Sequence, residues 1–142
     1  MISIRKSALF LALLAAHASA ASAEVKEISF GESVELKDYI AAGKTTVFDF
    51  YSEYCGPCRA LSSVLERLAG NRSDLLVVKV NINRPDISGI DWTSPVAERY
   101  GITGVPLLVI YNPEGKMTAR GHAARLQVSA WAKQAKNESA GD

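Results

Sequence analysis

The chain contains two cysteines, Cys55 and Cys58, separated by two residues in the stretch CGPC. With Gly56 and Pro57 between them, both sulfurs can meet across one helical turn, and Pro57 stiffens that turn without removing a needed N–H. A strand-like segment precedes the pair and a helix-like segment follows it. Cys55 therefore falls at a helix N-terminus, where unpaired backbone N–H groups and the helix dipole favour a thiolate over a thiol. We expect Cys55 to be the more acidic and more exposed sulfur, and Cys58 to attack a mixed disulfide formed on Cys55.

Two other uses of the cysteine pair are less favourable than reversible exchange. A structural crosslink that closes so small a loop stabilises the fold by roughly 2 kcal/mol in the chain-entropy model, less than the roughly 3 kcal/mol of a 15-residue loop. A four-ligand zinc site would need carboxylates or a second chain, because His17 and His122 are the only histidines of the sequence. The pattern therefore favours thiol–disulfide exchange.

Two charged residues interrupt apolar segments that read as buried strands. Asp49 lies within residues 45–51 (TTVFDFY), and Lys79 lies within residues 75–82 (LLVVKVNI). Burial of either charge alone costs several kcal/mol. We therefore expect the two side chains to pair with each other, to shift their protonation equilibria or to reach water at the strand ends.

A helix connects these two strands. Both strand segments carry apolar residues on both faces, which is typical of central strands covered by helices on both sides. Residues 59–69 carry an apolar stripe at helical spacing, and Gly70 is a suitable helix stop. The order of strand, helix and strand predicts a right-handed parallel crossover.

The remaining segments complete an α/β fold with a mixed sheet of four or five strands between helices. Ser94 is a suitable N-cap and Pro95 a suitable first residue for a short helix that ends at Gly101. The turn chemistry of residues 112–115 predicts a hairpin. The other predicted elements are a first strand at 24–30, a helix at 34–42, a loop at 84–93, strands at 106–111 and 116–120, and a closing helix that contains Leu126, Val128, Trp131, Ala132 and Ala135.

Length and composition indicate one folded domain. The 142 residues are 48% hydrophobic and 22% charged, which is typical of a globular chain and not of a disordered or fibrous one. Beyond residue 23 the chain carries 14 basic and 15 acidic residues, a net charge of −1. Because nucleic-acid binding normally requires a basic excess, we expect no nucleic-acid partner. We also expect the protein to be a monomer.

Residues 1–23 have the layout of a secretory signal peptide. Arg5 and Lys6 precede an apolar run at 7–16, and small residues suit cleavage near Ala20 or Ala23. The run is about half the roughly 20 residues that a membrane-spanning helix needs, which disfavours an uncleaved anchor. We therefore expect residues 24–142 to form the mature domain in a compartment where disulfides persist. This compartment is the periplasm if the source is bacterial; otherwise the protein is secreted.

Two stretches of the chain resemble the thioredoxin family: FDFYSEYCGPC at residues 48–58 and YGITGVP at residues 100–106. The resemblance extends over residues 24–137 in the order of elements. It implies a thioredoxin-like fold, with a mixed four- or five-stranded sheet flanked by helices on both faces, and thiol–disulfide exchange that needs no organic cofactor or metal. Tyr51 and Tyr54 stand where tryptophans are common in thioredoxins, so a hydrophobic rim is retained.

The same resemblance implies roles for the two charged residues. Asp49 falls where thioredoxins hold a buried acid behind the second cysteine, and Lys79 falls where they hold its lysine partner. A carboxyl whose pKa is raised by burial can accept the proton of Cys58 as that thiol becomes a thiolate.

The resemblance also implies a substrate-binding surface. Pro106 corresponds to the family's cis-proline, which lies against the two sulfurs, and the backbone of Val105 is then free to pair with an extended substrate segment. Tyr54, Gly56 and Pro57 are expected to complete the surface that meets the substrate.

We expect a protein-disulfide reductase, because the Gly-Pro insert and Asp49 resemble reducing thioredoxins, whose potential is about −270 mV against about −120 mV for a strong periplasmic oxidant. Such an exported reductase acts on protein disulfides and needs an external electron donor, for which a membrane thiol transporter is expected. Two alternatives stay open: an exported disulfide oxidant or isomerase, and a chaperone-like peptide-binding module without redox turnover. Trp92, in the long loop at 84–93, either contacts a partner or fixes its own loop.

Overall fold

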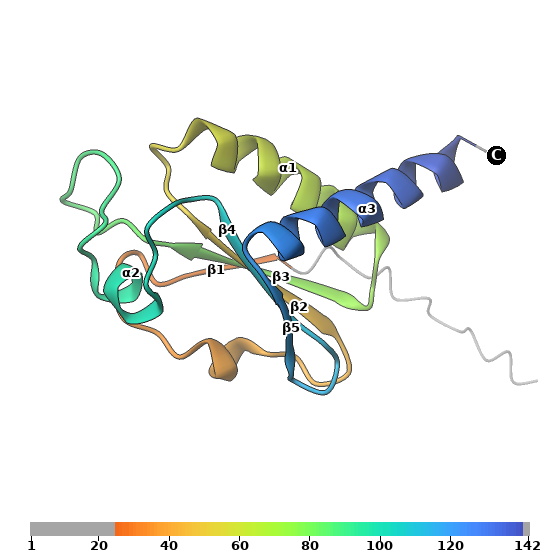
Figure 1. Cartoon of the computed structure of the whole chain (residues 1–142), viewed down its shortest axis with the longest axis horizontal. Helices are drawn as coiled ribbons and strands as arrows, with labels where there is room; N and C mark the ends of the chain where they lie inside the picture. The colour runs from red at the N-terminus through yellow and green to blue at the C-terminus, as the bar shows by residue number, and fades with distance from the viewer. Residues whose placement is uncertain (1–24, 141–142) are drawn as a thin grey trace, which may run out of the picture.

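The computed structural model describes residues 25–140, which form a five-stranded mixed sheet with helices on both faces (Figure 1). This architecture confirms the fold predicted from the sequence. In chain order the elements are β1 (Val25–Ile28), the 3-10 helix η1 (Leu36–Tyr39), β2 (Thr45–Tyr51), α1 (Gly56–Asn71), β3 (Leu75–Asn81), α2 (Pro95–Tyr100), β4 (Leu107–Tyr111), β5 (Met117–Arg120) and α3 (His122–Ser139).

The sheet has the strand order β1-β3-β2-β4-β5. Strands β1, β3 and β2 run parallel, whereas β4 is antiparallel to β2 and β5 is antiparallel to β4. The predicted β2–α1–β3 crossover is therefore present. The register places Asp49 of β2 directly beside Lys79 of β3, with Leu108 of β4 on its other side.

Alternation along β2 sends side chains to two separate apolar cores. Phe48 and Phe50 pack on the face covered by η1 and α2, and Val47 packs on the face covered by α1 and α3. Figure 1 shows these two pairs of helical segments on opposite sides of the sheet. Asp49 has the same parity as Val47, so its carboxyl group enters the layer between the sheet and α1.

Three local predictions were wrong. The helix expected to stop at Gly70 continues to Asn71, with Arg72 as its C-cap. Instead of a helix over residues 34–42 there is only the single turn η1, because the hydroxyl group of Tyr100 accepts a hydrogen bond from the Leu36 amide and donates one to the Val34 carbonyl. The first strand ends at Ile28 rather than at residue 30. Ser29, Phe30 and Gly31 turn the chain with positive φ angles of 81°, 51° and 84°.

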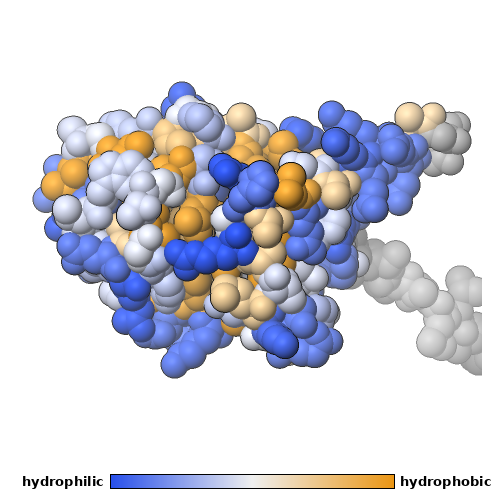
Figure 2. Space-filling model, in the orientation of Figure 1, coloured by the Kyte–Doolittle hydropathy of each residue, from blue (hydrophilic) through white to orange (hydrophobic). Residues whose placement is uncertain are grey.

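The surface on the side shown in Figure 2 is mixed. The C-terminal part of α3 projects to the right and is almost entirely hydrophilic, as expected for a solvated helix face. Within residues 25–140, none of the helices combines the length and apolar character needed to cross a membrane. The signal peptide and cleavage positions predicted from the sequence, together with His17, lie outside the residues that the structure describes.

Candidate active site

A disulfide joins Cys55 and Cys58 at the start of α1, with 5.3 Å between their Cα atoms. Cys55 is the N-cap residue of the helix, and the backbone N–H of Cys58 donates a hydrogen bond to its Sγ at 3.2 Å. Pro57 occupies the first turn, where a missing N–H costs nothing, and this turn contains no acidic residue. The helix N-terminus therefore stabilises negative charge on the sulfur of Cys55 when the disulfide opens.

Both cysteines are largely covered, and their order of exposure is the one expected. Cys55 retains 5% of its accessible surface and Cys58 retains 1%. Tyr51 forms a small buried cluster with the two cysteines, and the half-buried side chains of Ile90 and Val105 pack against this cluster. These apolar side chains therefore cover most of the disulfide.

The residues expected to bind substrate lie beside the disulfide. The carbonyl oxygen of Val105 lies 3.7 Å from the leading sulfur, and the Val105–Pro106 peptide bond is cis, as expected from the sequence. The side chain of Tyr54 is 50% exposed, and Gly56 and Pro57 are also exposed. The structure thus brings an exposed backbone and apolar side chains together beside the disulfide.

Asp49 is completely buried beneath α1. Its Oδ2 accepts a hydrogen bond from Ser62 Oγ at 3.3 Å, whereas its Oδ1 has no hydrogen-bond partner among the residues described. Burial raises the pKa of Asp49 from 3.8 to about 7, although the Ser62 hydrogen bond and the positive charge of Lys79 both act to lower it. The carboxyl group can therefore gain and lose a proton near neutral pH.

Lys79 acts on Asp49 through its charge. The two residues are register partners in the sheet, but Nζ of Lys79 is directed to Oε1 of Glu66 at 3.9 Å and lies 4.7 Å from the centre of the Tyr51 ring. The side chain of Lys79 is 19% exposed. Of the outcomes expected from the sequence, the raised pKa of Asp49 is therefore present, and the lysine reaches the surface beside it.

Sequence analysis did not identify Ser62, although one signal was available. Ser62 lies four residues after Cys58, and both fall on the buried face of α1 together with Leu65 and Ala69. A hydroxyl group on an otherwise buried helix face needs a hydrogen-bond partner inside the protein. Asp49 is that partner.

A groove of about 440 Å³, lined mainly by charged and hydroxyl-bearing residues, lies beside α1. Ser62 and Lys79 line it together with Tyr51, Arg59 and Glu66. Ser62 therefore contacts the buried carboxyl group on one side and the groove on the other.

Buried polar contacts hold the long loop after β3. The carboxylate of Asp91 accepts hydrogen bonds from Arg84 Nε at 2.7 Å and Nη2 at 3.0 Å, and these bonds lower the pKa of Asp91 to about 2. Asn83 donates to the carbonyl of Gly89 at 2.5 Å and accepts from the hydroxyl of Ser52 at 2.6 Å. The loop is thus fixed to the segment that precedes the cysteines.

This loop presents two apolar residues in different ways. Ile90 packs against the disulfide cluster, whereas the side chain of Trp92 is 42% exposed. Asp91 and Asn83 therefore fix the loop from the inside, and Trp92 is not its buried anchor. Sequence analysis identified Trp92 but missed Ile90, which is the loop residue that meets the reactive site.

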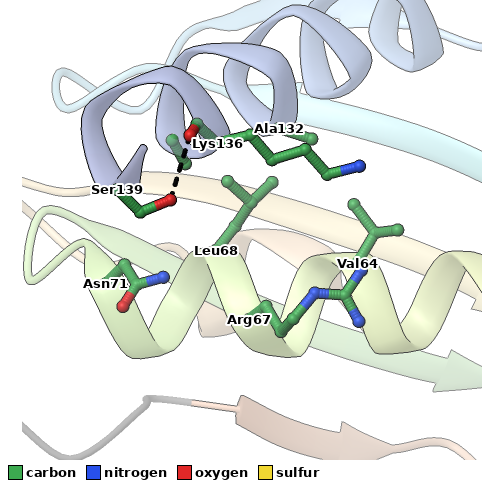
Figure 3. A pocket seen from close by; sticks show the side chains of 8 residues that line it. Val64, Arg67, Leu68, Asn71, Ala132, Lys136 and Ser139 are labelled. Atoms are coloured by element: carbon green, nitrogen blue, oxygen red, sulfur yellow. Dashed lines mark hydrogen bonds between the residues drawn. The ribbon is translucent and has the colours of Figure 1, made fainter. Parts of the chain in front are cut away.

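A second cavity of about 170 Å³ lies between α1 and α3, toward the C-terminal end of α1 and thus at the other end of the helix from the disulfide. Figure 3 shows Val64, Leu68 and Ala132 around it, with Arg67 and Lys136 nearby. Over residues 25–140, no cluster of three or more histidine, cysteine, aspartate or glutamate side chains is arranged to hold a metal ion.

Comparison with known proteins gives one consistent result. The family model described as Thioredoxin matches residues 24–134. The chain is 39% identical over 85 residues to a thioredoxin of Chlamydia caviae, covering 60% of this chain and 74% of that protein. It is 33% identical over 97 residues to a thioredoxin of Rhodospirillum rubrum, covering 68% of this chain and 80% of that protein.

Solved structures agree with these sequence matches. A mutant thioredoxin from Halobacterium salinarum NRC-1 is similar with a TM-score of 0.55 and 25% identity, covering 80% of this chain and 88% of that one. Spinach chloroplast thioredoxin f is similar with a TM-score of 0.53 and 25% identity, covering 82% and 88%.

Proposed function

Because this chain belongs to the thioredoxin family, whose members act on protein disulfides, we propose that it is a protein-disulfide reductase that works outside the cytoplasm. Thiol–disulfide oxidoreductase activity follows from the family and from the Cys55–Cys58 pair. The observation that carries the exchange chemistry is the hydrogen bond from the Cys58 N–H to the Cys55 sulfur at the start of α1. It stabilises the thiolate that attacks a substrate.

The reaction begins with the reduced protein. The Cys55 thiolate attacks one sulfur of a substrate disulfide, so that a mixed disulfide forms and the second substrate sulfur leaves as a thiolate, which takes up a proton. Cys58 then loses its proton and attacks the Cys55 sulfur. The mixed disulfide breaks, the substrate leaves as a dithiol, and the Cys55–Cys58 disulfide forms. Two electrons pass to the substrate, and the product is the oxidised state that the structure describes.

Asp49 is proposed to accept the proton of Cys58 in the second step. Its buried carboxyl group, with a pKa of about 7, matches the working pH of a general base in a neutral compartment. The charge of Lys79 lowers this pKa and so raises the ionised fraction of Asp49, while Glu66 and the ring of Tyr51 hold the lysine in place.

The surface beside the disulfide suits an extended peptide segment. Val105 presents its carbonyl oxygen next to the leading sulfur. We propose that backbone hydrogen bonds to Val105 align the substrate as a short added strand, while Tyr54, Gly56, Pro57 and Pro106 contact its side chains. Such binding recognises main chain rather than one sequence, which suits a reductase with several protein substrates.

The direction of electron transfer is proposed from the Gly-Pro insert and from Asp49. Equilibration with glutathione measures the reduction potential of the Cys55–Cys58 couple, which we expect to be about −270 mV. A reduction potential of about −120 mV would instead make the protein an oxidant. As a reductant it needs an external electron donor, for which we propose a membrane thiol transporter.

Reduction of insulin with a supplied dithiol tests turnover. Cys55→Ser is expected to abolish the reaction, whereas Cys58→Ser is expected to stop after one step and to accumulate a mixed disulfide with the substrate. His122→Ala is a matched control, because His122 begins α3, away from the cysteines in sequence and on another element. If the wild-type rate equals the background and Cys55→Ser still binds unfolded clients, the protein is a binding module and not a reductase.

Export is proposed from the layout of residues 1–23. Expression of the full chain in a bacterial host tests it. The periplasmic protein is expected to have an N-terminus at Ala21 or Glu24 by mass spectrometry. Recovery of the uncleaved chain from the cytoplasm would contradict export.

A further inference from the structure

One hydroxyl group connects the buried acid of the active site to solvent. Ser62 Oγ donates a hydrogen bond to Asp49 Oδ2 at 3.3 Å, and Ser62 also lines the groove beside α1. The residue retains 8% of its accessible surface, whereas Asp49 retains none. The side chain of Ser62 therefore lies between the carboxyl group of Asp49 and the groove.

The other sides of Asp49 offer no comparable polar contact. Its backbone is paired with Lys79 of β3 and with Leu108 of β4, and Leu108 is itself completely buried. The second carboxyl oxygen, Oδ1, is buried without a hydrogen-bond partner in the part of the chain that the structure describes. Among the described residues, the hydroxyl of Ser62 is thus the one hydrogen-bond partner observed for this carboxyl group.

The groove brings charged and hydroxyl-bearing side chains close to Ser62. With a volume of about 440 Å³ it has room for several water molecules. The charged residues around it are Glu53 and Arg59 near the start of α1, Glu66 one turn beyond Ser62, and Lys79 of β3. The phenol of Tyr51 also lines the groove, and Cys58 lies one turn before Ser62 on the buried face of α1, whereas β4 contributes the apolar side chain of Leu108 beside Asp49.

We propose that Ser62 is a positioning residue of the reductase, whose hydroxyl group orients the Asp49 carboxylate and passes protons between that carboxylate and water in the groove. The inference rests on the proposed role of Asp49 as the proton acceptor for Cys58. It adds the route by which Asp49 is returned to its ionised form before the next turnover.

The proton balance of the route is simple. After Cys58 gives its proton to Asp49, the carboxylic acid donates this proton to Ser62 Oγ while the Ser62 hydroxyl donates its own proton to a water molecule in the groove. Rotation of the hydroxyl then restores the hydrogen bond to Asp49 Oδ2 that the structure contains. Nothing is oxidised or reduced in this step, and one proton passes from the buried site to solvent.

A stopped-flow reaction with a chromogenic aryl disulfide separates the two cysteine steps. The first chromophore is released when Cys55 attacks, and the second is released when Cys58 resolves the mixed disulfide. We expect Ser62→Ala to leave the first release within about twofold of wild type and to slow the second about tenfold near neutral pH, a part of the 10²–10⁴-fold that a positioned proton transfer supplies. In the wild type the hydrogen bond from Ser62 lowers the pKa of Asp49. Because Ser62→Ala removes this bond, the pH midpoint of the second release is expected to move upward.

Two serine variants separate the hydroxyl group from packing effects. Ser62→Thr keeps a hydroxyl and is expected to restore the second release to within about twofold. Ser63→Ala is the matched control, because Ser63 is the next residue on α1 but its hydroxyl donates to the carbonyl of Arg59. Equal slowing in Ser62→Ala and Ser62→Thr, or a second release in Ser62→Ala that matches wild type at every pH, would overturn the inference.

A double-mutant cycle separates this inference from the proposed function. Asp49→Asn is expected to slow the second release, and Ser62→Ala is expected to add no further slowing in that background because Ser62 acts through Asp49. If Asp49→Asn slows the second release and Ser62→Ala does not, only the role of Ser62 is wrong. If Asp49→Asn leaves the second release unchanged, the proposed role of Asp49 is wrong as well.

Discussion

The substitution Asp49→Asn should make the oxidised protein more stable, and the gain should depend on pH. In the folded protein burial raises the pKa of Asp49 from 3.8 to about 7. Between these values the unfolded chain has lost this proton while the folded protein keeps it, so rising pH favours unfolding. Each pH unit in this range lowers the free energy of unfolding by about 1.4 kcal/mol, and the total loss is roughly 4 kcal/mol by about pH 8. The stability that Asp49 contributes by keeping its proton is fully present below its pKa in the unfolded chain, 3.8. It is lost as the pH rises through its pKa in the folded protein, about 7.

Asparagine isolates this effect because it has nearly the same size as aspartate, stays neutral and can still accept the hydrogen bond from Ser62. Urea unfolding of both oxidised proteins, followed by circular dichroism from about pH 4 to about pH 8.5, measures the difference in the free energy of unfolding. We expect the two proteins to agree within about 1 kcal/mol near pH 4, and Asp49→Asn to be more stable by about 3–4 kcal/mol near pH 8. A difference that does not change with pH would refute the reasoning, because it would show that Asp49 ionises equally in both states.

Three further predictions concern the segments that support the site. Hydrogen bonds from Arg84 hold the pKa of Asp91 at about 2, so the wild type should lose stability as the pH falls from about 4 to about 2. In acid urea titrations Asp91→Asn should remove this loss, and at neutral pH it should lower the free energy of unfolding by about 2 kcal/mol. Gly31→Ala should destabilise the protein by about 3 kcal/mol or more in thermal unfolding, because an added Cβ at this φ of +84° would lie 2.6 Å from the backbone N of Arg84. Gly43 has a similar φ of +78° but open space around it, so Gly43→Ala should cost only about 1 kcal/mol. Equal losses in the two variants would contradict the steric argument. Ile90→Ala should speed reduction of the disulfide by dithiothreitol several-fold in stopped-flow fluorescence, because Ile90 packs against it; an unchanged rate would show that this side chain does not limit access.

The unit that carries the cysteines was predictable because its determinants are close in sequence. The two-faced strands, the apolar stripe on residues 59–69 and the CGPC stretch lie within 40 residues of one another, from Thr45 to Ile82. Their spacing alone predicts a parallel crossover with Cys55 at a helix N-terminus. The structure contains that crossover, and it places Cys55 at the N-cap of α1.

The segment at 34–42 shows where such local reasoning fails. Its apolar residues permit a helix, but Tyr100 bonds the backbone of Val34 and Leu36 from more than 60 residues away and leaves only one helical turn. Likewise, Ile90 is an ordinary loop residue in the sequence, and it becomes part of the site because Asn83 and Asp91 fold the loop inward.

The sequence by itself determined the reactive group, because the acidity of the leading cysteine depends on a helix N-terminus that the neighbouring residues build. Only the tertiary structure decided the environment of Asp49. Its burial, the Ser62 hydroxyl and the charge of Lys79 come from three elements that meet through the register of β2 with β3 and the packing of α1 on the sheet. Desolvation depends on which distant segments exclude water, and no local pattern specifies this.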